Sequence, residues 1–398
     1  MQVVLLSKEY PPFIYGGIGT FVKNLAIGLF REGARVTIIS GYPVPNTLSH
    51  VKRVEINKEK DAELNIIRFP YLDIHPNNAF FQLLNLNRIY KTIKDVNPDI
   101  IHGQSLSTFP ALIRLKNLAP VIVTFHSSPK TEKALSVYSF LRGGSIDDFG
   151  THVIGYPALS FIIRKELRNS NIAVAVSKNL MSELLDEMGE TYREKMREIH
   201  NGIDIESLEK EYESVEDDVE EANDTLLFAG RLVWRKGALN LIKIAYFLQK
   251  QKLDFKLIVH GDGALFRGVK KAVQNFQLTN VELKGFTSRA QMMRSMRRSK
   301  FVVIPSFYEA CPMILLESMC LGKIPVTFNL PYSVEFTENG KYGIMAKNTK
   351  DVVEQLKIAY KKVDLESFSD KIKDFARRKY NIKNMSVKYL NLYKDMLI

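Results

Sequence analysis

The feature that most constrains the fold is a regular alternation, along the whole chain, between short β-branched runs and longer amphipathic stretches. This pattern is typical of a parallel sheet whose strands are joined by covering helices. The stretch TFVKNLAIGLFREG places Phe21, Leu25, Leu29 and Phe30 on one helical face and ends at Gly33, a common helix stop. The candidate strands are residues 3–7, 35–40, 66–69, 100–103, 121–126, 172–177 and 198–203 in the first series, and residues 225–230, 255–261, 281–285, 301–306, 323–328 and 343–346 in the second.

An acidic segment separates the two series. A chain of 398 residues exceeds the size at which a single hydrophobic core stops growing, so two domains are expected. Residues 206–224 contain ten acidic residues and one lysine. We therefore predict an N-terminal α/β domain over residues 1–205, an acidic linker over 206–224 and a C-terminal α/β domain over 225–379. The amphipathic tail, residues 380–398, predicts a final helix.

The charge of the chain is unevenly distributed. The net charge is +12, and because the acidic segment carries −9, the remainder carries +21. Such an excess suggests an anionic partner: phosphate groups, nucleic acid or an acidic membrane surface. The most basic cluster consists of Arg289, Arg294, Arg297, Arg298 and Lys300. It lacks the interleaved aromatic residues that stack on bases, which disfavours nucleic acid.

Cysteine content and hydropathy predict a cytoplasmic protein. The longest nearly apolar stretch, residues 153–163, is too short to cross a membrane, and no basic region precedes the first apolar run VVLL. The two cysteines, Cys311 and Cys320, would lie about 13 Å apart along a helix, beyond disulfide reach. Neither a disulfide framework nor a cysteine-based zinc site is therefore expected.

Candidate functional residues follow the first-series strands, because open α/β sheets bind ligands beyond the carboxyl ends of their strands. Gly16 and Gly17 precede a helix and can bring backbone N–H groups close to an anion. The sequence from Gly17 to Val22 approaches a dinucleotide-binding fingerprint. However, nine residues separate Ser7 from Gly17, and no acidic residue closes the second strand. NAD binding is therefore disfavoured.

His102, His126 and His152 differ in their positions relative to the candidate strands. His126 ends the run VIVTFH and is followed by a loop, which makes it a candidate ligand-binding residue. His102 and His152 have no comparable position, and we expect structural roles for both.

The second series has similar features at its strand ends. The segment AGRLVWRKG contains Arg231, Arg235 and Lys236 directly after a strand, and such clustered cations suit a diphosphate. The runs HGDG, residues 260–263, and KGF, residues 284–286, each end a strand with glycine and leave room for a flat ligand such as a nucleotide base.

The stretch PSFYEACPMILLESMCLG places two glutamates eight positions apart across a strand-to-helix junction. Pro312 suits the first turn of the helix. Glu309 would then lie at the end of the strand and Glu317 within the helix. Both carboxylates can reach one elongated ligand from the same side.

The ordered set of motifs resembles the family 4 retaining glycosyltransferases of GT-B fold. The motifs run through nearly the whole chain: GG near residue 16, TFH at 124–126, AVS at 175–177, NGID at 201–204, GRLVWRKG at 230–237, GDG at 261–263 and Glu-x7-Glu at 309–317. The resemblance implies two Rossmann-like, doubly wound parallel-sheet domains facing a cleft, with the C-terminal helix crossing back to the N-terminal domain.

The resemblance also implies transfer of a sugar, with retention at the anomeric carbon and without metal or another cofactor. The donor would be a UDP-, GDP- or ADP-sugar, and the acceptor a saccharide, a lipid-linked compound or a small molecule. Peripheral contact with the inner face of the membrane is compatible with this reading. The resemblance assigns catalytic roles to His126, Arg231, Lys236 and Glu309, and donor-binding roles to Gly16, Gly17, Gly261, Asp262, Gly285, Phe286, Cys311, Pro312, Met313, Ile314 and Glu317.

In detail, the family roles place the diphosphate on Arg231 and Lys236 and the ribose hydroxyls on Glu317. Glu309 would contact the transferred sugar as a ligand and need not act as a nucleophile, since similar enzymes let a donor phosphate oxygen take the acceptor proton. His126 would reach that sugar from the other domain.

Two departures from the family pattern leave the identity of the donor sugar open. Ala310-Cys311-Pro312 stands where the family has glycines after the first glutamate, and 329–332 replaces a glycine pair before Glu335. A glucan, polysaccharide or disaccharide synthase on the same fold remains an alternative. A sugar phosphorylase is disfavoured because no pyridoxal-phosphate lysine is identifiable. The more distant alternative is a basic nucleic-acid-binding or membrane-binding protein without catalysis.

Overall fold

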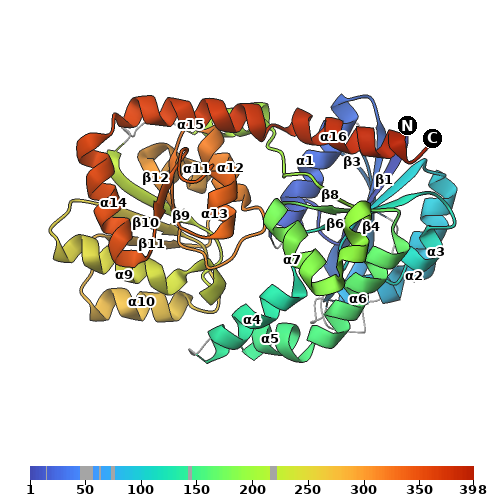
Figure 1. Ribbon diagram of the computed structural model, residues 1–398, viewed down its shortest axis with the longest axis horizontal. Helices are drawn as coiled ribbons and strands as arrows, with labels where there is room; N and C mark the ends of the chain where they lie inside the picture. The colour runs from blue at the N-terminus through green and yellow to red at the C-terminus, as the bar shows by residue number, and fades with distance from the viewer. Residues whose placement is uncertain (15, 45–56, 62–63, 73–76, 142–145, 216–221) are drawn as a thin grey trace. The chain divides into compact units, whose positions relative to one another are not determined.

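Two separate sheets organise the chain, each covered by helices (Figure 1). The computed structural model describes residues 1–14, 16–44, 57–61, 64–72, 77–141, 146–215 and 222–398. The first unit comprises Met1–Ser136, Asp147–Gly202 and Ile382–Ile398, and the second comprises Val137–Ile146 and Ile203–Asn381. Both units are α/β domains built on largely parallel sheets, as the sequence pattern predicts.

The first unit has the strand order β3-β4-β2-β1-β5-β6-β7-β8. All pairs are parallel except β3 with β4. Its strands are β1 (Gln2–Leu6), β2 (Arg35–Val44), β3 (Asn57–Asp61), β4 (Leu64–Leu72), β5 (Ile100–Gln104), β6 (Val121–Phe125), β7 (Ile172–Ala175) and β8 (Met196–Glu198). Its helices are α1 (Gly17–Arg31), α2 (Asn77–Val96), α3 (Leu112–Leu115), α4 (Pro129–Phe140, continuing into the second unit), α5 (Ile146–Phe149), η2 (Gly150–Ile154), α6 (Tyr156–Asn169), α7 (Lys178–Met188), η3 (Glu190–Lys195) and α16 (Ile382–Asp395).

The second unit has the order β11-β10-β9-β12-β13-β14, and all its pairs are parallel. Its strands are β9 (Ala222–Ala229), β10 (Lys256–His260), β11 (Val281–Gly285), β12 (Ser299–Ile304), β13 (Ile324–Phe328) and β14 (Ile344–Ala346). Its helices are α8 (Ile205–Glu213), η4 (Trp234–Lys236), α9 (Ala238–Lys250), α10 (Phe266–Asn275), α11 (Arg289–Arg298), α12 (Met313–Cys320), α13 (Pro331–Phe336), α14 (Thr349–Lys362) and α15 (Leu365–Lys379). Helix α9 packs against α10 and α14, whereas α15 packs against α12.

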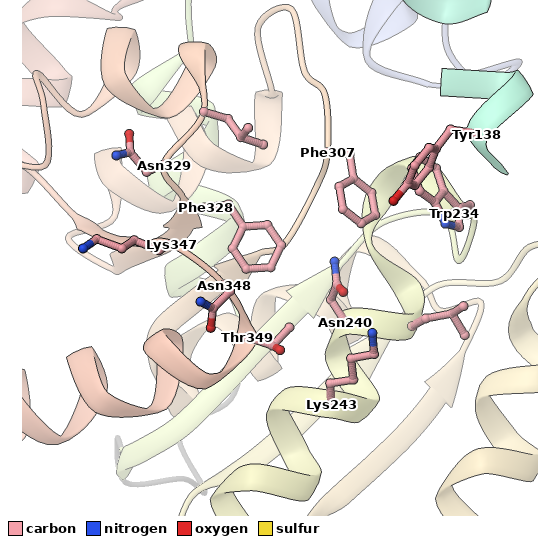
Figure 2. Close-up of a pocket in the computed structure, with 12 residues that line it drawn as sticks. Tyr138, Trp234, Asn240, Lys243, Phe307, Phe328, Asn329, Lys347, Asn348 and Thr349 are labelled. Atoms are coloured by element: carbon pink, nitrogen blue, oxygen red, sulfur yellow. The ribbon is translucent and has the colours of Figure 1, made fainter. Parts of the chain in front are cut away.

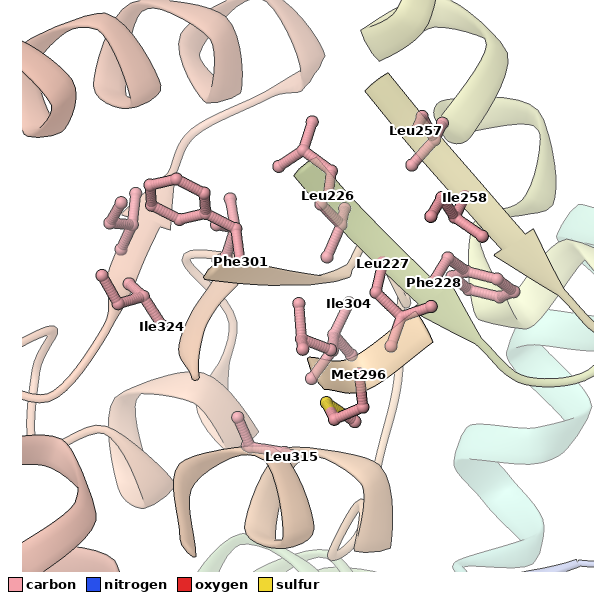
Figure 3. Close-up of a cluster of buried hydrophobic side chains, with 14 of the residues drawn as sticks. Leu226, Leu227, Phe228, Leu257, Ile258, Met296, Phe301, Ile304, Leu315 and Ile324 are labelled. Carbon is pink, nitrogen blue, oxygen red and sulfur yellow. The ribbon is translucent and has the colours of Figure 1, made fainter. Parts of the chain in front are cut away.

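The cores follow from the apolar runs that predict the strands. In the second unit, Leu226, Phe301 and Leu315 are fully buried where β9, β12 and α12 meet (Figure 3). Burial of each such side chain contributes roughly 1.5–3 kcal/mol relative to exposure. In the first unit, Phe21, Leu25 and Leu29 form the buried face of α1, as its periodicity predicts.

The C-terminal helix α16 belongs to the first unit, where it lies beside α1 (Figure 1). Tyr389 and Tyr393 are fully buried on its inner face. The Tyr393 hydroxyl is 2.6 Å from Nδ1 of His102, and the Tyr389 hydroxyl is 3.0 Å from Oγ1 of Thr124. These buried polar contacts join the end of the chain to strands β5 and β6.

Three sequence expectations differ from the structure. The expected strand at 198–203 is β8, Met196–Glu198. Ile199 still donates to Ala175 of β7, but the Gly202 carbonyl beyond it accepts a hydrogen bond from Asn24 of α1. The sequence pattern does not predict strand β3. It pairs antiparallel at the edge of the sheet, and its sequence NKEKD has no apolar alternation.

The acidic segment is the third difference. The first part of the expected linker, up to Glu213, belongs to α8, and β9 begins at Ala222, before the expected domain start. Leu208 is buried in the core of the second unit. Glu209 forms an ion pair with Arg377 of α15. The segment is therefore amphipathic and its first half is part of the second unit; residues 216–221 lie outside the described part of the chain.

Candidate active site

The site in the second unit lies where the winding of the sheet reverses. From β9 the chain proceeds outward to β10 and β11 and then returns to begin β12 on the other side of β9. Ligands of open α/β sheets bind beyond the carboxyl ends of the strands at such a switch point. Lys236 follows β9 and Glu309 follows β12, so the two central strands deliver both residues to this point.

Lys236 and Glu309 form a largely buried ion pair. Nζ of Lys236 donates to both carboxylate oxygens of Glu309, at 2.6 and 2.8 Å. Oγ of Ser306 donates to Oε1 at 2.7 Å. The side chains of Lys236 and Glu309 are 23% and 9% exposed. Both oxygens of Glu309 are therefore engaged in the unliganded protein.

The electrostatic balance keeps Glu309 ionised. Burial on its own would raise the pKa of this carboxyl group. The charges of Lys236 and Arg235, with the hydrogen bonds from Lys236 and Ser306, outweigh burial and lower the pKa below its ordinary value.

Glycines allow the turns after β9, β10 and β11 to lie against one another. Gly261 has φ of +133°, and a Cβ atom there would overlap the carbonyl oxygen of Gly230. The N–H of Gly261 donates to the carbonyl of Gly285 at 2.8 Å, and that of Gly230 donates to His260 at 3.0 Å. The backbone of the turn after β9 thus occupies the space that a side chain at position 261 would need.

Glu317, in α12, is held by an arginine from a different element. Its Oε2 accepts from Nη1 of Arg289 at 2.8 Å, and Nε of Arg289 also donates to Glu211 at 2.9 Å. Burial would lower the pKa of Arg289, but the charges of Glu317 and Glu211 and their hydrogen bonds raise it above its ordinary value. Among the described residues, none donates a hydrogen bond to Oε1 of Glu317, which leaves this oxygen available to a ligand.

The remaining candidates of the second unit lie around the same edge. Arg231 is exposed, and none of the residues that the structure describes pairs with its guanidinium. Asp262 accepts a hydrogen bond from the N–H of Gly263 at 2.7 Å. Phe286 is 88% exposed. Cys311, Pro312, Met313 and Ile314 form the entry to α12, with Pro312 as the residue immediately before the helix.

In the first unit, β1 and β5 form the corresponding switch point. Gly16 precedes α1 and Gly17 is its first residue; both are exposed. Phe21, one turn further along α1, makes an edge contact with His126, with ring centroids 4.9 Å apart. The helix start and the end of β6 therefore lie close together within this unit.

His126 is neutral and oriented by a glutamine. Its Nε2 lies 2.8 Å from Oε1 of Gln104, at the end of β5. Because that oxygen can only accept, Nε2 carries the proton and Nδ1 is left as an acceptor. Burial lowers the pKa of His126 to about 3.

His102 is inside the first unit. It is fully buried, and Nδ1 and Nε2 lie 2.6 and 2.7 Å from Tyr393 and Thr124. Burial, with a smaller contribution from His126, lowers the pKa of His102 to about 3. This geometry suits a structural histidine. His152 lies in η2, and its Nδ1 is buried without a partner among the described residues.

Sequence reasoning missed the residues that orient the candidates. Ser306 and Gln104 carry no recognisable motif, although Ser306 stands three residues before Glu309. Arg289 was placed in a basic surface cluster. The structure corrects this: Arg289 pairs with Glu317, and Lys300 is buried and paired with Glu366 at 2.6 Å. Two members of the cluster, Arg289 and Lys300, are therefore held in ion pairs, whereas Arg294 and Arg298 are exposed. The five residues do not form one continuous basic patch.

No helix in the described part of the chain combines the length and apolar character needed to cross a bilayer.

Comparison with known proteins agrees with this architecture. Residues 15–207 match the family model described as Glycosyltransferase Family 4, and residues 210–379 match Glycosyl transferases group 1. Glycogen synthase of Mycobacterium tuberculosis (strain ATCC 25618 / H37Rv) is 23% identical over 362 residues, which cover 86% of this chain and 82% of that protein.

Two solved structures share the fold. Sucrose-phosphate synthase from Thermosynechococcus elongatus is similar with a TM-score of 0.78 at 15% identity, covering 99% of this chain and 98% of that one. Anabaena HepE in complex with UDP-glucose is similar with a TM-score of 0.67 at 15% identity, covering 99% and 100%. Together, the two matched regions span nearly the whole chain in the order of its two sheets, and the protein belongs to the family 4 glycosyltransferases of GT-B fold.

Proposed function

We propose that this glycosyltransferase moves a sugar from a nucleoside diphosphate sugar to a saccharide, lipid-linked or small-molecule acceptor, with retention and without a metal ion. The observation that carries the proposal is the buried Lys236–Glu309 pair at the switch point of the second sheet. A lysine and a carboxylate held together in this position can bind the two ends of one sugar–phosphate bond.

Lys236 and Arg231 are assigned to the donor diphosphate. An ammonium group has three N–H donors, and Lys236 uses two contacts on Glu309, so a further donor can reach a phosphate oxygen. The Arg231 guanidinium suits a second phosphate. As the sugar–phosphate bond breaks, the leaving diphosphate gains negative charge. The two cations would stabilise this charge, as a bound metal ion does in other enzymes.

Glu317 and the glycine turns are assigned to the nucleoside. The available Oε1 of Glu317 can accept a ribose hydroxyl hydrogen, while Arg289 holds the other oxygen. Gly285 and the exposed Phe286 offer backbone space and a ring face for the base. HepE, whose structure contains UDP-glucose, supports a nucleotide-sugar donor for this fold.

Glu309 is assigned as a ligand of the transferred sugar. Both of its oxygens already accept hydrogen bonds, which lowers its capacity to attack carbon. In the proposed reaction the bond from the anomeric carbon to the diphosphate breaks, and the electron pair leaves with the diphosphate. The acceptor oxygen bonds to that carbon on the same face, and its proton passes to a donor phosphate oxygen.

The first unit is assigned to the sugar and acceptor. Gly17 would offer backbone N–H groups at the start of α1 to the donor phosphates. His126, neutral at physiological pH, would make an uncharged hydrogen bond to a sugar hydroxyl. A lipid-linked acceptor would bring the protein to the membrane surface.

A panel of UDP-, GDP- and ADP-sugars tests the donor assignment by thermal shift and by donor hydrolysis, since a specific ligand stabilises the folded state. We expect one nucleotide to stabilise the protein with and without EDTA. Lys236→Ala and Arg231→Ala should each lower turnover by roughly 10²- to 10³-fold. Lys250→Ala, an exposed lysine of α9, is the matched control. Near-native turnover in the first two variants would refute the diphosphate assignment.

A polymer synthase is the second candidate, because glycogen synthase is among the relatives. Product length distinguishes the two: a single added sugar indicates a simple transferase, and a ladder of products indicates a polymer synthase. Trapping a glycosyl adduct on Glu309 would overturn the assignment of that residue.

A further inference from the structure

A cavity of about 450 Å³ lies in the second unit beside the candidate donor site (Figure 2). It opens among the turns after β9, β12, β13 and β14 and the first turns of α9 and α14. Its volume is within the range of small-molecule sites, roughly 300–1,000 Å³. None of the residues assigned above to the donor lines it.

Aromatic rings form one wall of the cavity. Trp234 and Phe307 are stacked, with ring centroids 4.3 Å apart and planes at 12°, and Phe328 lies 6.4 Å from Phe307. Figure 2 shows Phe307, Phe328, Asn240 and Lys243 around the same space. These rings provide a rigid apolar surface of the kind that packs against the C–H face of a ring-shaped ligand.

Amide groups with unused hydrogen-bonding capacity line the same space. Oδ1 of Asn240 has no hydrogen-bond partner among the described residues, although the residue is buried. Oδ1 of Asn348 accepts from two N–H groups of α14, and its Nδ2 has no partner in the described part of the chain. Asn329 adds a third amide. Each amide can both donate and accept, which suits hydroxyl groups.

The charge of the lining selects an anion. Lys243 and Lys347 line the cavity and are exposed, and no aspartate or glutamate is among the described lining residues. Two lysines without a compensating carboxylate attract a phosphate or a similar group. The aromatic wall suits the C–H face of a sugar ring, the three amides suit its hydroxyl groups, and the two lysines suit a phosphate. Together these groups fit a sugar that carries a phosphate.

We propose that this cavity binds a phosphate-bearing saccharide at a site separate from the nucleotide. Trp234 is two residues from Lys236, and Phe307 is two residues from Glu309. The N–H of Phe307 also donates to the carbonyl of Arg235 at 2.8 Å. The two loops that carry the stacked rings of Trp234 and Phe307 thus also carry the donor ion pair. That the cavity binds this saccharide is independent of the proposed transferase function. That the bound saccharide is the acceptor rests on it.

Trp234 makes the test specific, because it is the single tryptophan of the chain. Its fluorescence is recorded while hexose 1-phosphate, hexose 6-phosphate, free hexose or inorganic phosphate is added to the 398-residue protein. We expect saturable binding of at least one hexose phosphate, with free hexose and inorganic phosphate binding at least tenfold more weakly. No binding by either hexose phosphate, or equal binding of free hexose, would overturn the proposal.

Substitutions locate the binding. Lys243→Gln with Lys347→Gln should weaken hexose phosphate binding roughly tenfold or more. Lys250→Gln with Lys361→Gln removes the same charge from exposed positions of α9 and α14 and should leave the affinity for hexose phosphate unchanged. Both double variants should retain their thermal midpoint and nucleoside diphosphate affinity. Equal affinity in the two double variants would refute the site. If nucleoside diphosphates fail to bind while hexose phosphate binds, only the donor assignment fails.

Activity assays and a displacement assay distinguish three kinds of ligand: a soluble acceptor, an effector and a lipid-linked headgroup. Incorporation of the hexose phosphate into product identifies a soluble acceptor, and a change in rate without incorporation identifies an effector. Displacement of bound hexose phosphate by vesicles that contain a glycosyl polyprenyl phosphate identifies a lipid-linked headgroup. Each of these results supports the site, because each requires Lys243 and Lys347.

Discussion

Replacing Lys236 by methionine isolates the buried charge that this lysine balances. In the native protein Glu309 is buried. It is ionised because the charges of Lys236 and Arg235 outweigh the effect of burial on its pKa. A lowered folded-state pKa means that the carboxylate contributes stability above its ordinary pKa, and this contribution is lost as the pH falls through the folded value. Methionine preserves most of the side-chain volume and removes the charge.

The magnitude follows from the exposure of the pair. Removing one partner of a fully buried pair costs roughly 3–5 kcal/mol. Because the Lys236 side chain is 23% exposed, we expect a smaller loss, about 2–3 kcal/mol at pH 8. That loss corresponds to a fall of roughly 4–12 °C in the thermal midpoint of a domain of 150–250 residues.

The dependence on pH provides the sharper test. Without Lys236, burial raises the pKa of Glu309, so the variant gains stability by protonation as the pH is lowered. Calorimetry at pH 5 and pH 8 on Lys236→Met, Glu309→Gln and the double variant measures this effect, with Lys250→Met as control. We expect a larger loss at pH 8 and partial recovery in the double variant. Equal losses at both pH values, without recovery, would refute the reasoning.

Three further predictions concern other parts of the two units. Gly261→Ala forces a Cβ atom onto the carbonyl oxygen of Gly230 at a φ of +133°, so both the thermal midpoint and the nucleoside diphosphate affinity should fall; an unchanged midpoint would contradict the close approach. Tyr393→Phe removes the partner of Nδ1 of His102 and should cost about 1–3 kcal/mol in denaturant titration, with donor affinity retained. Phe286→Ala should weaken nucleotide binding by about 0.5–1.5 kcal/mol and leave the free protein's midpoint unchanged, because the ring is 88% exposed; unaltered affinity would exclude stacking on the base.

Most strand positions were predictable because the apolar runs that form the central strands are fully buried. The run FVVI lies within β12, whose six residues are all buried, so its composition alone indicates a central strand. The polar run NKEKD of β3 has no such signal, since this edge strand is defined by its antiparallel pairing with β4. Strand β8 ends at Glu198 although β-branched residues follow it, because the Gly202 carbonyl accepts a hydrogen bond from Asn24 of α1 instead of from a neighbouring strand.

The candidate residues of the donor site were predictable by position, but their partners were not. Strand ends in an α/β sheet meet at one edge, so Lys236 and Glu309 could be placed there from their order alone. Their mutual ion pair, and the pairing of Arg289 with Glu317, depend on contacts between residues 73 and 28 positions apart. From the sequence alone, Arg289 belongs to a basic cluster that would face an anionic partner, and its pairing with Glu317 is not apparent.

The sequence by itself determined the two α/β series, the helix that ends the chain and the order of the motifs, because local periodicity and strand-end position are properties of neighbouring residues. The tertiary structure decided which charges meet, which are buried and which face open space. The cavity lined by Trp234, Phe307 and Lys347 is the clearest case: its walls come from turns far apart in the chain, and only the folding of the second sheet brings them together.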